Sequence, residues 1–507
     1  MDAVGVGGSA VAGAGSGGVA GRAGRGTGGR AGNGAAGKAG APTAGNASVG
    51  EAGAAGDPTG GRGGSGGGPI VPGKIAGFGV NGQPRNWGSD GTNVKAALDL
   101  LVNDLGANLF RVEINRGESD WEAKNDDADP MNFAWNAYDP IFESKDFTDL
   151  WDYIRYLNSL GVTEIELAAH GLLPDWMGGE SLSSGKQDEF VETMLAVLLY
   201  ARNRAPEPRP EFTLFSPWNE TNYGPPEGFS LSARDGVPLL RKLVDRMSQF
   251  PELDDIRIVT PETAGEDESV TWRGALLGDA VVSKRLQAIG YHRYSGHQTG
   301  HDWHGVTPPQ WMTEFNDVAG FCYTTSWDDG MQLAGNLFGA LESGAEAAMV
   351  WSDYDAPHSH QSDEWQTFGL LAGSYQGSSD LCTKFMKPPS GSELDAITYA
   401  PKPTYYAAQH FFAYVQRGAE VVPVSDDQNH LRMLGFQNPD GTLAIVGQND
   451  GSAGTWTIHV NGDDPGAMSM WVSKEDSYDK AASAVTFKNG SASVTVPEYS
   501  MFSLLSK

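Results

Sequence analysis

The chain has 507 residues and a formal net charge of -29, from 35 Lys and Arg against 64 Asp and Glu. So acidic a chain repels polyanions, which excludes nucleic acid as a partner and favours neutral or cationic ligands. The sequence contains no run of about 18 apolar residues, and this excludes a membrane-spanning helix.

Residues 1–68 are mainly Gly and Ala, with scattered Ser, Thr, Asn and Arg. Such a segment buries too little apolar surface to offset the entropy lost on ordering, so it is predicted to be a flexible linker. No apolar signal segment is visible. Because low-complexity tethers are common in exported or surface-attached proteins, we expect an extracellular or cell-surface location.

From residue 69 to residue 418 the chain alternates strand-like apolar runs with amphipathic helical ones, which predicts parallel strands. The strand candidates are 75–80, 107–114, 164–170, 212–217, 256–261, 286–291, 310–313 and 347–351. The helix candidates include 93–105, 147–160, 189–204, 234–249, 330–343 and 404–416. Eight strand and helix units of this size predict an α/β fold, a (β/α)8 TIM barrel with long loops.

Residues 419–507 have a different pattern, with short strands separated by turn residues such as Pro439-Asp440-Gly441 and Asn461-Gly462. The strand candidates are 420–424, 431–437, 443–448, 455–460, 468–472, 484–488, 491–496 and 501–505. This pattern predicts a C-terminal antiparallel β-sandwich domain, to which we assign a structural role.

Two glutamates each end an apolar, strand-like run: Glu220 closes FTLFSPWNE and Glu314 closes PQWMTE. In a barrel of parallel strands the carboxyl ends open on one face, so positions distant in sequence can meet there. A retaining glycosidase needs two carboxyls about 5–5.5 Å apart, one to protonate the leaving oxygen and one to attack the anomeric carbon. The pair therefore predicts cleavage of glycosidic bonds.

The motifs from Ile75 to Lys507 resemble those of clan A glycoside hydrolases. In that clan the acid/base follows an Asn at the end of strand four, as Glu220 follows Asn219, and the nucleophile ends strand seven, as Glu314 does. Further matches are an arginine on strand two, a tyrosine after strand six and an aromatic residue ending strand eight, here Arg111, Tyr294 and Trp351.

Within the clan, the chain is most similar to glycoside hydrolase family 30. The similar segments are GFG at the first strand, PDWM after the third, WMTE at the seventh and KPTYYAAQHFFAYV before the sandwich. The chain departs from that family in having Asn219-Glu220-Thr221 where family 30 usually has Asn-Glu-Pro.

The resemblance and the chemistry together assign roles. Glu220 is expected to be the general acid, protonated at rest beside the charge of Glu314, and then the base for the incoming water. Glu314 has to be ionised, and donation from Arg111 or Tyr294 is expected to keep its pKa low. Asn219 is expected to face the sugar 2-hydroxyl.

Further substrate contacts are predicted near the carboxyl ends of the strands. Aromatic rings stack on the C–H face of sugars, and His side chains donate or accept hydrogen bonds with hydroxyls. Glu262, at the end of the fifth strand, either bonds substrate or holds a neighbouring side chain. The candidates are Trp176, Trp218, Tyr223, Trp351, His170, His292 and Glu262.

No metal or cofactor is predicted. His292, His297, His301 and His304 lie in a glycine-containing segment after a strand, where a loop is favoured over a metal-binding helix face. The acidic residues of segment 125–129 lack the spaced pattern of a calcium loop and are expected to be solvated. Cys322 and Cys382 follow neighbouring strands, so either a disulfide at the rim of the cleft or two free thiols is possible.

The sequence therefore predicts a retaining β-glycoside hydrolase, monomeric, that cleaves a β-linked polysaccharide of the xylan or β-glucan class from within the chain. Two alternatives are a carbohydrate-binding protein that has lost catalysis on the same fold, and a transglycosylase in which a sugar hydroxyl replaces water. A third is a structural or adhesion protein without sugar affinity.

Overall fold

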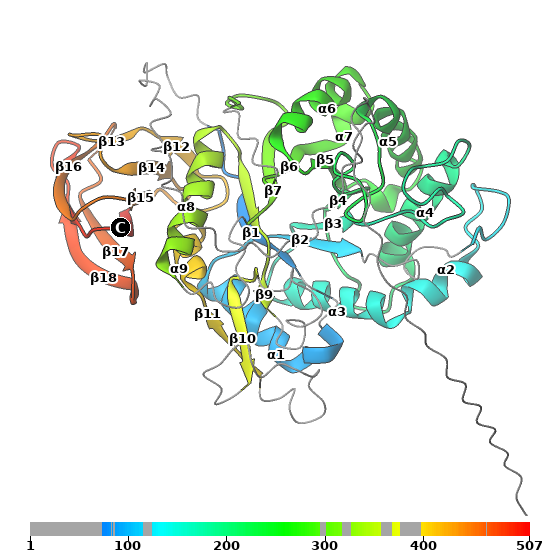
Figure 1. Cartoon of the computed structure of the whole chain (residues 1–507), viewed down its shortest axis with the longest axis horizontal. Coiled ribbons are helices and arrows are strands. Elements are labelled where there is room, and N and C mark those ends of the chain that lie inside the picture. The colour runs from blue at the N-terminus through cyan, green and yellow to red at the C-terminus, as the bar shows by residue number, and fades with distance from the viewer. Residues whose placement is uncertain are drawn as a thin grey trace, which may run out of the picture. The chain divides into compact units, whose positions relative to one another are not determined.

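A computed structural model describes residues 73–82, 84, 87–114, 124–294, 301–316, 326–355, 368–375, 397–462 and 464–506. Eight parallel strands form a closed barrel in sequence order, and β1 closes it against β8 through the pairing of Gly77 with Ala347. The barrel strands are β1 (Gly77–Gly82), β2 (Leu109–Ile114), β3 (Ile165–Ala169), β4 (Leu214–Ser216), β5 (Arg257–Thr263), β6 (Leu286–His292), β7 (Gln310–Phe315) and β8 (Ala347–Val350). The predicted (β/α)8 barrel is confirmed (Figure 1).

Helices connect the strands on the outside of the barrel (Figure 1). They are α1 (Trp87–Asp99), α2 (Trp135–Phe142), α3 (Lys145–Ser159), α4 (Gln187–Leu199), α5 (Ala233–Met247), α6 (Glu266–Gly278), α7 (Val282–Arg285), α8 (Trp327–Glu342) and α9 (Pro403–Phe412). Short π turns, η2 (Leu100–Asp104) and η3 (Tyr200–Arg204), extend α1 and α4, and a 3-10 turn, η4 (Pro251–Leu253), follows α5. Local signals set some ends: Ser232 accepts the Asp235 N–H at the start of α5, and Pro403 is the first residue of α9.

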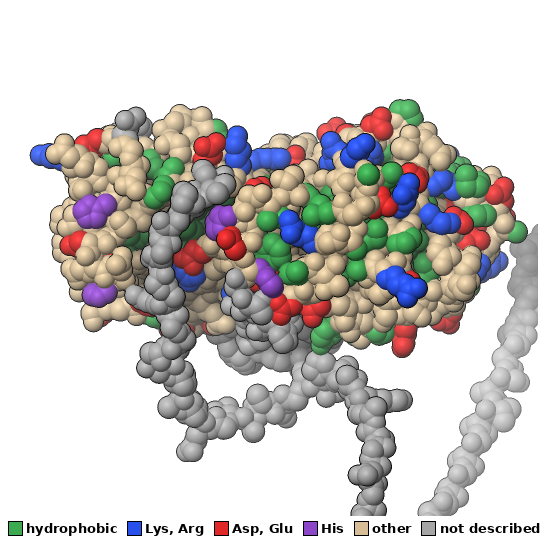
Figure 2. Space-filling view, turned by 90° about the horizontal axis from the view of Figure 1, so that it is seen from above, with side chains coloured by type: hydrophobic (Ala, Val, Ile, Leu, Met, Phe, Trp, Pro, Cys, Tyr) green, Lys and Arg blue, Asp and Glu red, His purple; other side chains and the backbone are tan. Residues whose placement is uncertain are grey.

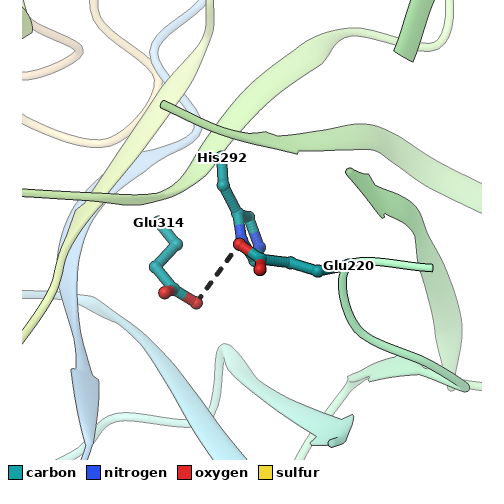
Figure 3. A group of neighbouring side chains, drawn as sticks. All are labelled: Glu220, His292 and Glu314. Atoms are coloured by element: carbon teal, nitrogen blue, oxygen red, sulfur yellow. Dashed lines mark hydrogen bonds and ion pairs between the residues drawn. The ribbon is translucent and has the colours of Figure 1, made fainter. Parts of the chain in front are cut away.

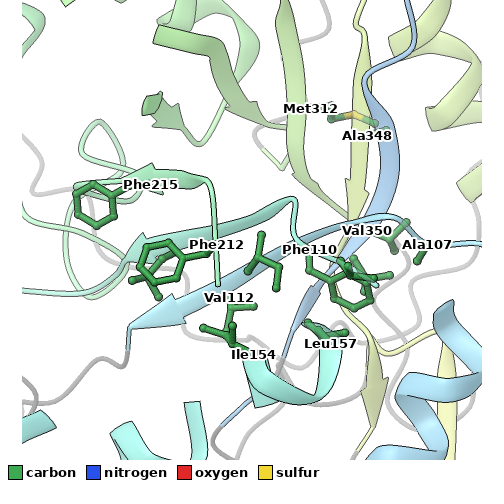
Figure 4. Close-up of a cluster of buried hydrophobic side chains, with 14 of the residues drawn as sticks. Ala107, Phe110, Val112, Ile154, Leu157, Phe212, Phe215, Met312, Ala348 and Val350 are labelled. Atoms are coloured by element: carbon green, nitrogen blue, oxygen red, sulfur yellow. The ribbon is translucent and has the colours of Figure 1, made fainter. Parts of the chain in front are cut away.

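Alternation along β2 shows how the barrel separates its two faces. Phe110 and Val112 point outward into the main core, where they lie near Ile154 and Leu157 of α3 (Figure 4). Leu109 belongs instead to a small cluster in the barrel interior with residues of β4 to β8. Since side chains alternate along a strand, Arg111 and Glu113 share the inner face with Leu109.

The chain after β8 forms a small sheet that the sequence analysis does not predict. Its strands are β9 (Tyr354–Asp355), β10 (Leu371–Tyr375) and β11 (Ile397–Pro401). The buried ion pair between Asp355 and Lys402 connects β9 with the start of α9.

The C-terminal strands form two antiparallel sheets, which confirms the predicted sandwich. One sheet has the order β12-β14-β15-β20-β17-β18 and the other β13-β16-β19. Their strands are β12 (Glu420–Val422), β13 (Val424–Asp426), β14 (Arg432–Gln437), β15 (Leu443–Asn449), β16 (Gly454–Val460), β17 (Ala467–Lys474), β18 (Ser477–Thr486), β19 (Ser491–Val496) and β20 (Ser500–Ser506). The predicted strand 420–424 divides at Pro423, which cannot donate to a ladder, so that β12 and β13 join different sheets.

Helices α8 and α9 both contact the sandwich. Trp327 of α8 donates its indole N–H to the Tyr499 carbonyl (2.9 Å), and His410 of α9 lies between the hydroxyls of Ser503 and Ser473 (2.7 and 2.9 Å). In the part of the chain that the structure describes, no helix is both long and apolar enough to span a membrane.

Candidate active site

Charged side chains from four barrel strands, and one from the segment after a fifth strand, converge at the carboxyl end of the barrel. Arg111 comes from β2, Glu262 from β5, His292 from β6 and Glu314 from β7, and Glu220 follows β4. In barrels of this type the catalytic groups lie at this end, because the strands place their last residues around one opening.

Glu220 and Glu314 face each other beside His292 (Figure 3). One oxygen of each carboxylate and one nitrogen of His292 all lie within 4.8 Å of one another. The Glu220 and Glu314 side chains are 8% and 9% exposed, whereas His292 is fully buried. The two carboxylates therefore line the opening, and the imidazole supports them from within.

Arg111 is a fully buried hub for this site. Its guanidinium donates to Glu314 Oε2 (2.9 Å) and to Asn219 Oδ1 (2.6 Å), and its Nε lies 3.1 Å from Glu262 Oε2. Burial opposes its charge, but the carboxylates around it, Glu262 first, outweigh burial and raise the pKa of Arg111. Arg111 is thus a permanent cation that orients Asn219, Glu262 and Glu314.

Glu314 does not keep the low pKa that the sequence analysis expects. Burial raises its pKa to about 7, although His292 and Arg111 act in the opposite direction. The Tyr294 hydroxyl donates to Glu314, and its own pKa is raised well above the usual value by burial and by the Glu314 charge. Arg111 and Tyr294 therefore both contact Glu314 as predicted, but desolvation outweighs them.

His292 touches three carboxylates. Its Nδ1 lies 2.7 Å from Glu220 and 3.6 Å from Glu314, and its Nε2 lies 3.0 Å from Glu262. Burial disfavours a charged imidazole, yet Glu314 and the hydrogen bond to Glu220 outweigh burial and raise the pKa of His292 to about 10. His292 is therefore a cation at neutral pH, and its Nδ1–H donates to Glu220 Oε1.

Glu262 is an inner support of the site. It is fully buried and accepts a hydrogen bond from Thr313 Oγ1 (3.1 Å), and despite burial Arg111 and His292 lower its pKa. Of the two alternatives in the sequence analysis, this position favours holding neighbouring side chains over contact with substrate. Glu262 and Glu220 both have positive φ, 55° and 37°, and the Glu220 N–H donates to the Glu262 carbonyl (2.8 Å). Such backbone strain in non-glycine residues is concentrated at functional sites.

Sequence reasoning missed two other buried partners of Arg111. Asn81 of β1 accepts from the guanidinium (2.9 Å), and Glu166 of β3 lies 3.4 Å from its Nε. Burial, followed by the charge of Glu262, raises the pKa of Glu166 well above its usual value. The alternation of β3 carried a signal, since Glu166 shares the inner face with Ala168 and His170.

The other residues predicted to contact substrate differ in burial and in their hydrogen-bond partners. Asn219 is buried and donates to the Glu227 carbonyl (3.1 Å), and His170 lies near the side chain of Glu227. Trp351 is buried at the end of β8, whereas Tyr223 is 52% exposed.

Two of the tryptophans predicted to contact sugar, Trp176 and Trp218, already pack against other side chains. Trp176 is half-buried in the loop after β3, and the Lys186 ammonium lies 4.8 Å from its ring centre. Trp218 is 1% exposed and packs against Trp272 in the core, a position that disfavours the predicted sugar contact.

Donor atoms of Glu220, His292 and Glu314 converge as metal ligands would. Their other contacts disfavour an ion, because Arg111 already donates to Glu314 and the raised pKa of His292 keeps its nitrogens protonated. In the described part of the segment after β6, His301 pairs with Asp267 and His304 with Asp302, so these two side chains have different partners. His297, Cys322 and Cys382 lie outside the described residues.

Several solved structures of known proteins have a similar fold. No protein-family model matches the chain. The catalytic domain of the glycoside hydrolase family 30 xylanase C from Talaromyces cellulolyticus is 17% identical, with a TM-score of 0.66, and the match covers 86% of this chain and 98% of that one. A family 30 subfamily 8 xylanase from Clostridium acetobutylicum is 16% identical, with a TM-score of 0.64 and coverages of 86% and 97%.

An endo-β-1,6-glucanase is also similar, at 16% identity and a TM-score of 0.60, over 85% of this chain and 92% of the glucanase. Likeness at these identities shows a shared fold. It agrees with the resemblance to glycoside hydrolase family 30 that the sequence motifs carry.

Proposed function

We propose that this protein is a retaining β-glycoside hydrolase in which Glu220 is the acid/base and Glu314 the nucleophile. The observation that carries the proposal is the spacing of the two carboxylates, whose facing oxygens lie within 4.8 Å. Retaining enzymes hold their carboxyls about 5–5.5 Å apart, whereas inverting enzymes leave about 6.5–9.5 Å for a water molecule. The short separation favours double displacement.

The substrate is proposed to be a β-linked polysaccharide of the xylan or β-glucan class, cleaved within the chain. Support comes from the solved structures with the same fold, which include xylanases and an endo-β-1,6-glucanase. An extracellular or surface-tethered location, with residues 1–68 as a linker before the barrel and the sandwich, is part of the same proposal.

In the first step a Glu314 oxygen attacks the anomeric carbon while the bond to the leaving sugar oxygen breaks. Glu220 protonates the leaving oxygen with the proton that its partner His292 supplies, and a glycosyl ester on Glu314 results. Arg111 orients Glu314 for the attack and, through Asn219 Oδ1, turns that amide toward the site.

In the second step Glu220 accepts a proton from water as the water oxygen attacks the anomeric carbon. The ester bond breaks, Glu314 leaves as a carboxylate, and the pair of Glu220 and His292 regains its proton. Retention of configuration follows, because the anomeric carbon is displaced twice.

The test is reducing-sugar release from xylans, β-1,3-, β-1,4- and β-1,6-glucans, galactans and mannans, with Glu314→Gln beside the parent. We expect hydrolysis of one polymer class and a loss of at least about 10⁴-fold in kcat in the variant, since the nucleophile is removed. NMR of the first product then shows whether the β-configuration is retained.

Equal activity of parent and variant would remove Glu314 from the mechanism. If neither the parent nor Glu314→Gln released reducing sugar from any polymer, but the protein bound a polymer in affinity electrophoresis, the carbohydrate-binding alternative would be supported. Products longer than the substrate at high concentration would indicate transglycosylation.

A further inference from the structure

A buried carboxyl of β3, that of Glu166, lies beside Arg111 together with the carboxyl of Glu262. Both glutamate side chains are 0% exposed. Arg111 Nε lies 3.1 Å from Glu262 Oε2 and 3.4 Å from Glu166 Oε1, so one guanidinium nitrogen faces two carboxyls. Neither step of the proposed mechanism uses Glu166, and its protonation state has to follow from its surroundings.

The two carboxyls differ in the donors around them. Glu262 accepts a hydrogen bond from Thr313 Oγ1 at 3.1 Å and lies 3.0 Å from His292 Nε2. In the part of the chain that the structure describes, neither oxygen of Glu166 has a hydrogen-bond partner. Because a buried carboxylate is stable only where donors replace water, these surroundings favour the ionised form for Glu262 and the protonated form for Glu166.

The strand register places an apolar side chain next to Glu166. Register partners on adjacent parallel strands point to the same face. Glu166 is paired with Arg111 of β2 on one side and with Leu214 of β4 on the other. Leu214 belongs to the apolar cluster in the barrel interior that also contains Leu109 and Trp311. Glu166 therefore lies at the boundary between the charged groups of the site and this apolar cluster.

The charged groups around Glu166 act in both directions. Burial, followed by the charge of Glu262, raises the pKa of Glu166 well above the usual value, whereas Arg111 and His292 lower it. Both cations also contact Glu262 and Glu314. The net direction is toward the protonated form of Glu166, in agreement with its lack of donors and with its apolar neighbour.

We propose that Glu166 is a positioning residue that holds a proton at neutral pH and supports Arg111 as a neutral carboxylic acid. A neutral carboxyl fills the space beside Arg111 Nε, and its carbonyl oxygen is still an acceptor. A carboxylate at this place would compete with Glu314 for the guanidinium charge and would disfavour the ionised nucleophile. The role in positioning rests on the proposed hydrolase function, whereas the protonation of Glu166 is measured without activity.

The proton is tested by infrared difference spectroscopy of the parent against Glu166→Gln at pH 9, where Glu314, with a pKa of about 7, is ionised. We expect the substitution to remove the C=O stretching band of a protonated carboxylic acid, and this band to move to lower frequency in protein equilibrated with D2O. Glu164→Gln is the matched control, because Glu164 is 27% exposed and lies 3.0 Å from Arg417. Its substitution should remove carboxylate bands instead.

Activity tests the positioning role. Glu166→Ala is expected to lower kcat/KM at least about tenfold on the polymer that the parent hydrolyses, because Arg111 and Glu314 shift when their support is removed. Glu166→Gln should restore most of that loss. It should also keep the acidic limb of the pH profile of kcat/KM near 7, as in the parent, because no charge is changed. Glu164→Ala should match the parent.

Loss of carboxylate bands in Glu166→Gln would overturn the inference, since Glu166 would then be ionised. An acidic limb at lower pH in Glu166→Gln than in the parent would also overturn it, because the substitution would have removed a negative charge near Glu314. Activity of Glu166→Ala equal to that of the parent would exclude the positioning role. If Glu166→Gln does not fold, Glu166→Met provides the difference spectrum with another neutral side chain. No hydrolysis by the parent would overturn the proposed function and leave the infrared result on Glu166 standing.

Discussion

His292 couples the protonation of the two proposed catalytic residues. Its Nδ1 lies 2.7 Å from Glu220 Oε1, and its charge is the leading influence that counteracts the effect of burial on Glu314. A carboxyl with a raised pKa is ionised only above that pKa, so Glu314 becomes a nucleophile as the pH rises through about 7. His292 loses its proton as the pH rises through about 10.

We therefore expect kcat/KM to follow a bell-shaped pH profile, with an acidic limb near 7 and a basic limb near 10. In His292→Gln the acidic limb should move to higher pH, because Glu314 loses a positive neighbour. The basic limb should move to lower pH, because the imidazole no longer offers a place for the proton. Initial rates between pH 4 and 11 measure both limbs.

His301→Gln is the matched control, since His301 pairs with Asp267 away from the two carboxylates. Its profile should coincide with that of the parent. A His292→Gln profile of unchanged width, merely lowered in height, would contradict the coupling and leave His292 a purely steric role.

At the scale of elements, Gly290 of β6 leaves room for the Glu262 side chain of β5. A Cβ on Gly290 would lie 1.7 Å from Glu262 Oε1. Gly290→Ala should displace that carboxylate, and with it Arg111 and His292. We expect kcat/KM to fall at least about 100-fold in a folded protein, because displacements of about 1 Å are sufficient for losses of this size.

Gly274→Ala in α6 is the matched control, because no atom lies within 4 Å of the added Cβ. It should keep full activity and gain about 0.5–1 kcal/mol in the free energy of unfolding, as expected for Gly to Ala in a helix. Urea unfolding and circular dichroism check that both variants fold. Activity of Gly290→Ala near that of the parent would show that the Glu262 position is not needed.

The barrel strands were predictable because each is a short apolar run bounded by turn or helix signals. β6 was expected at 286–291 and forms at Leu286–His292, so its register already placed His292 at the strand end. The sheet of β9 to β11 was not predicted, because β9 has only two residues and gives no periodic signal.

The candidate active site, like the fold, was predictable only in part. Glu220 and Glu314 could be recognised from strand ends and flanking motifs. The buried network of Asn81, Glu166 and Glu262 around Arg111 depends on which inward residues of different strands meet, and a single sequence does not contain those pairings. The burial that raises the pKa of Glu314 is likewise a property of the closed barrel.

At the scale of the whole molecule, acidic and basic side chains are neighbours on the face that Figure 2 shows. Pairs such as Arg241 with Asp279 and Lys242 with Asp188 show this local neutralisation. The net charge of -29 therefore disfavours anionic partners in general.

The junction of barrel and sandwich contains a buried, neutral histidine. His410 of α9 bonds Ser503 of β20 and Ser473 of β17, and burial lowers its pKa to about 3. The unfolded chain takes up a proton on this histidine below about pH 6.5, whereas the folded chain does so only near pH 3. The stability that the neutral histidine contributes is therefore complete above pH 6.5 and is lost as the pH falls toward 3.

We expect the free energy of unfolding of the parent to fall between pH 6.5 and 4 more steeply than that of His410→Gln, by up to about 1.4 kcal/mol per pH unit, the limit for one proton. Urea unfolding at pH 7, 5.5 and 4 measures the difference. His459→Gln removes a half-buried histidine from β16 and provides the matched comparison. If the free energies of unfolding of the parent and His410→Gln differed by the same amount at all three pH values, protonation of His410 would not affect the stability of the junction. The loss of stability in acid would then have to come from the paired carboxylates of the barrel.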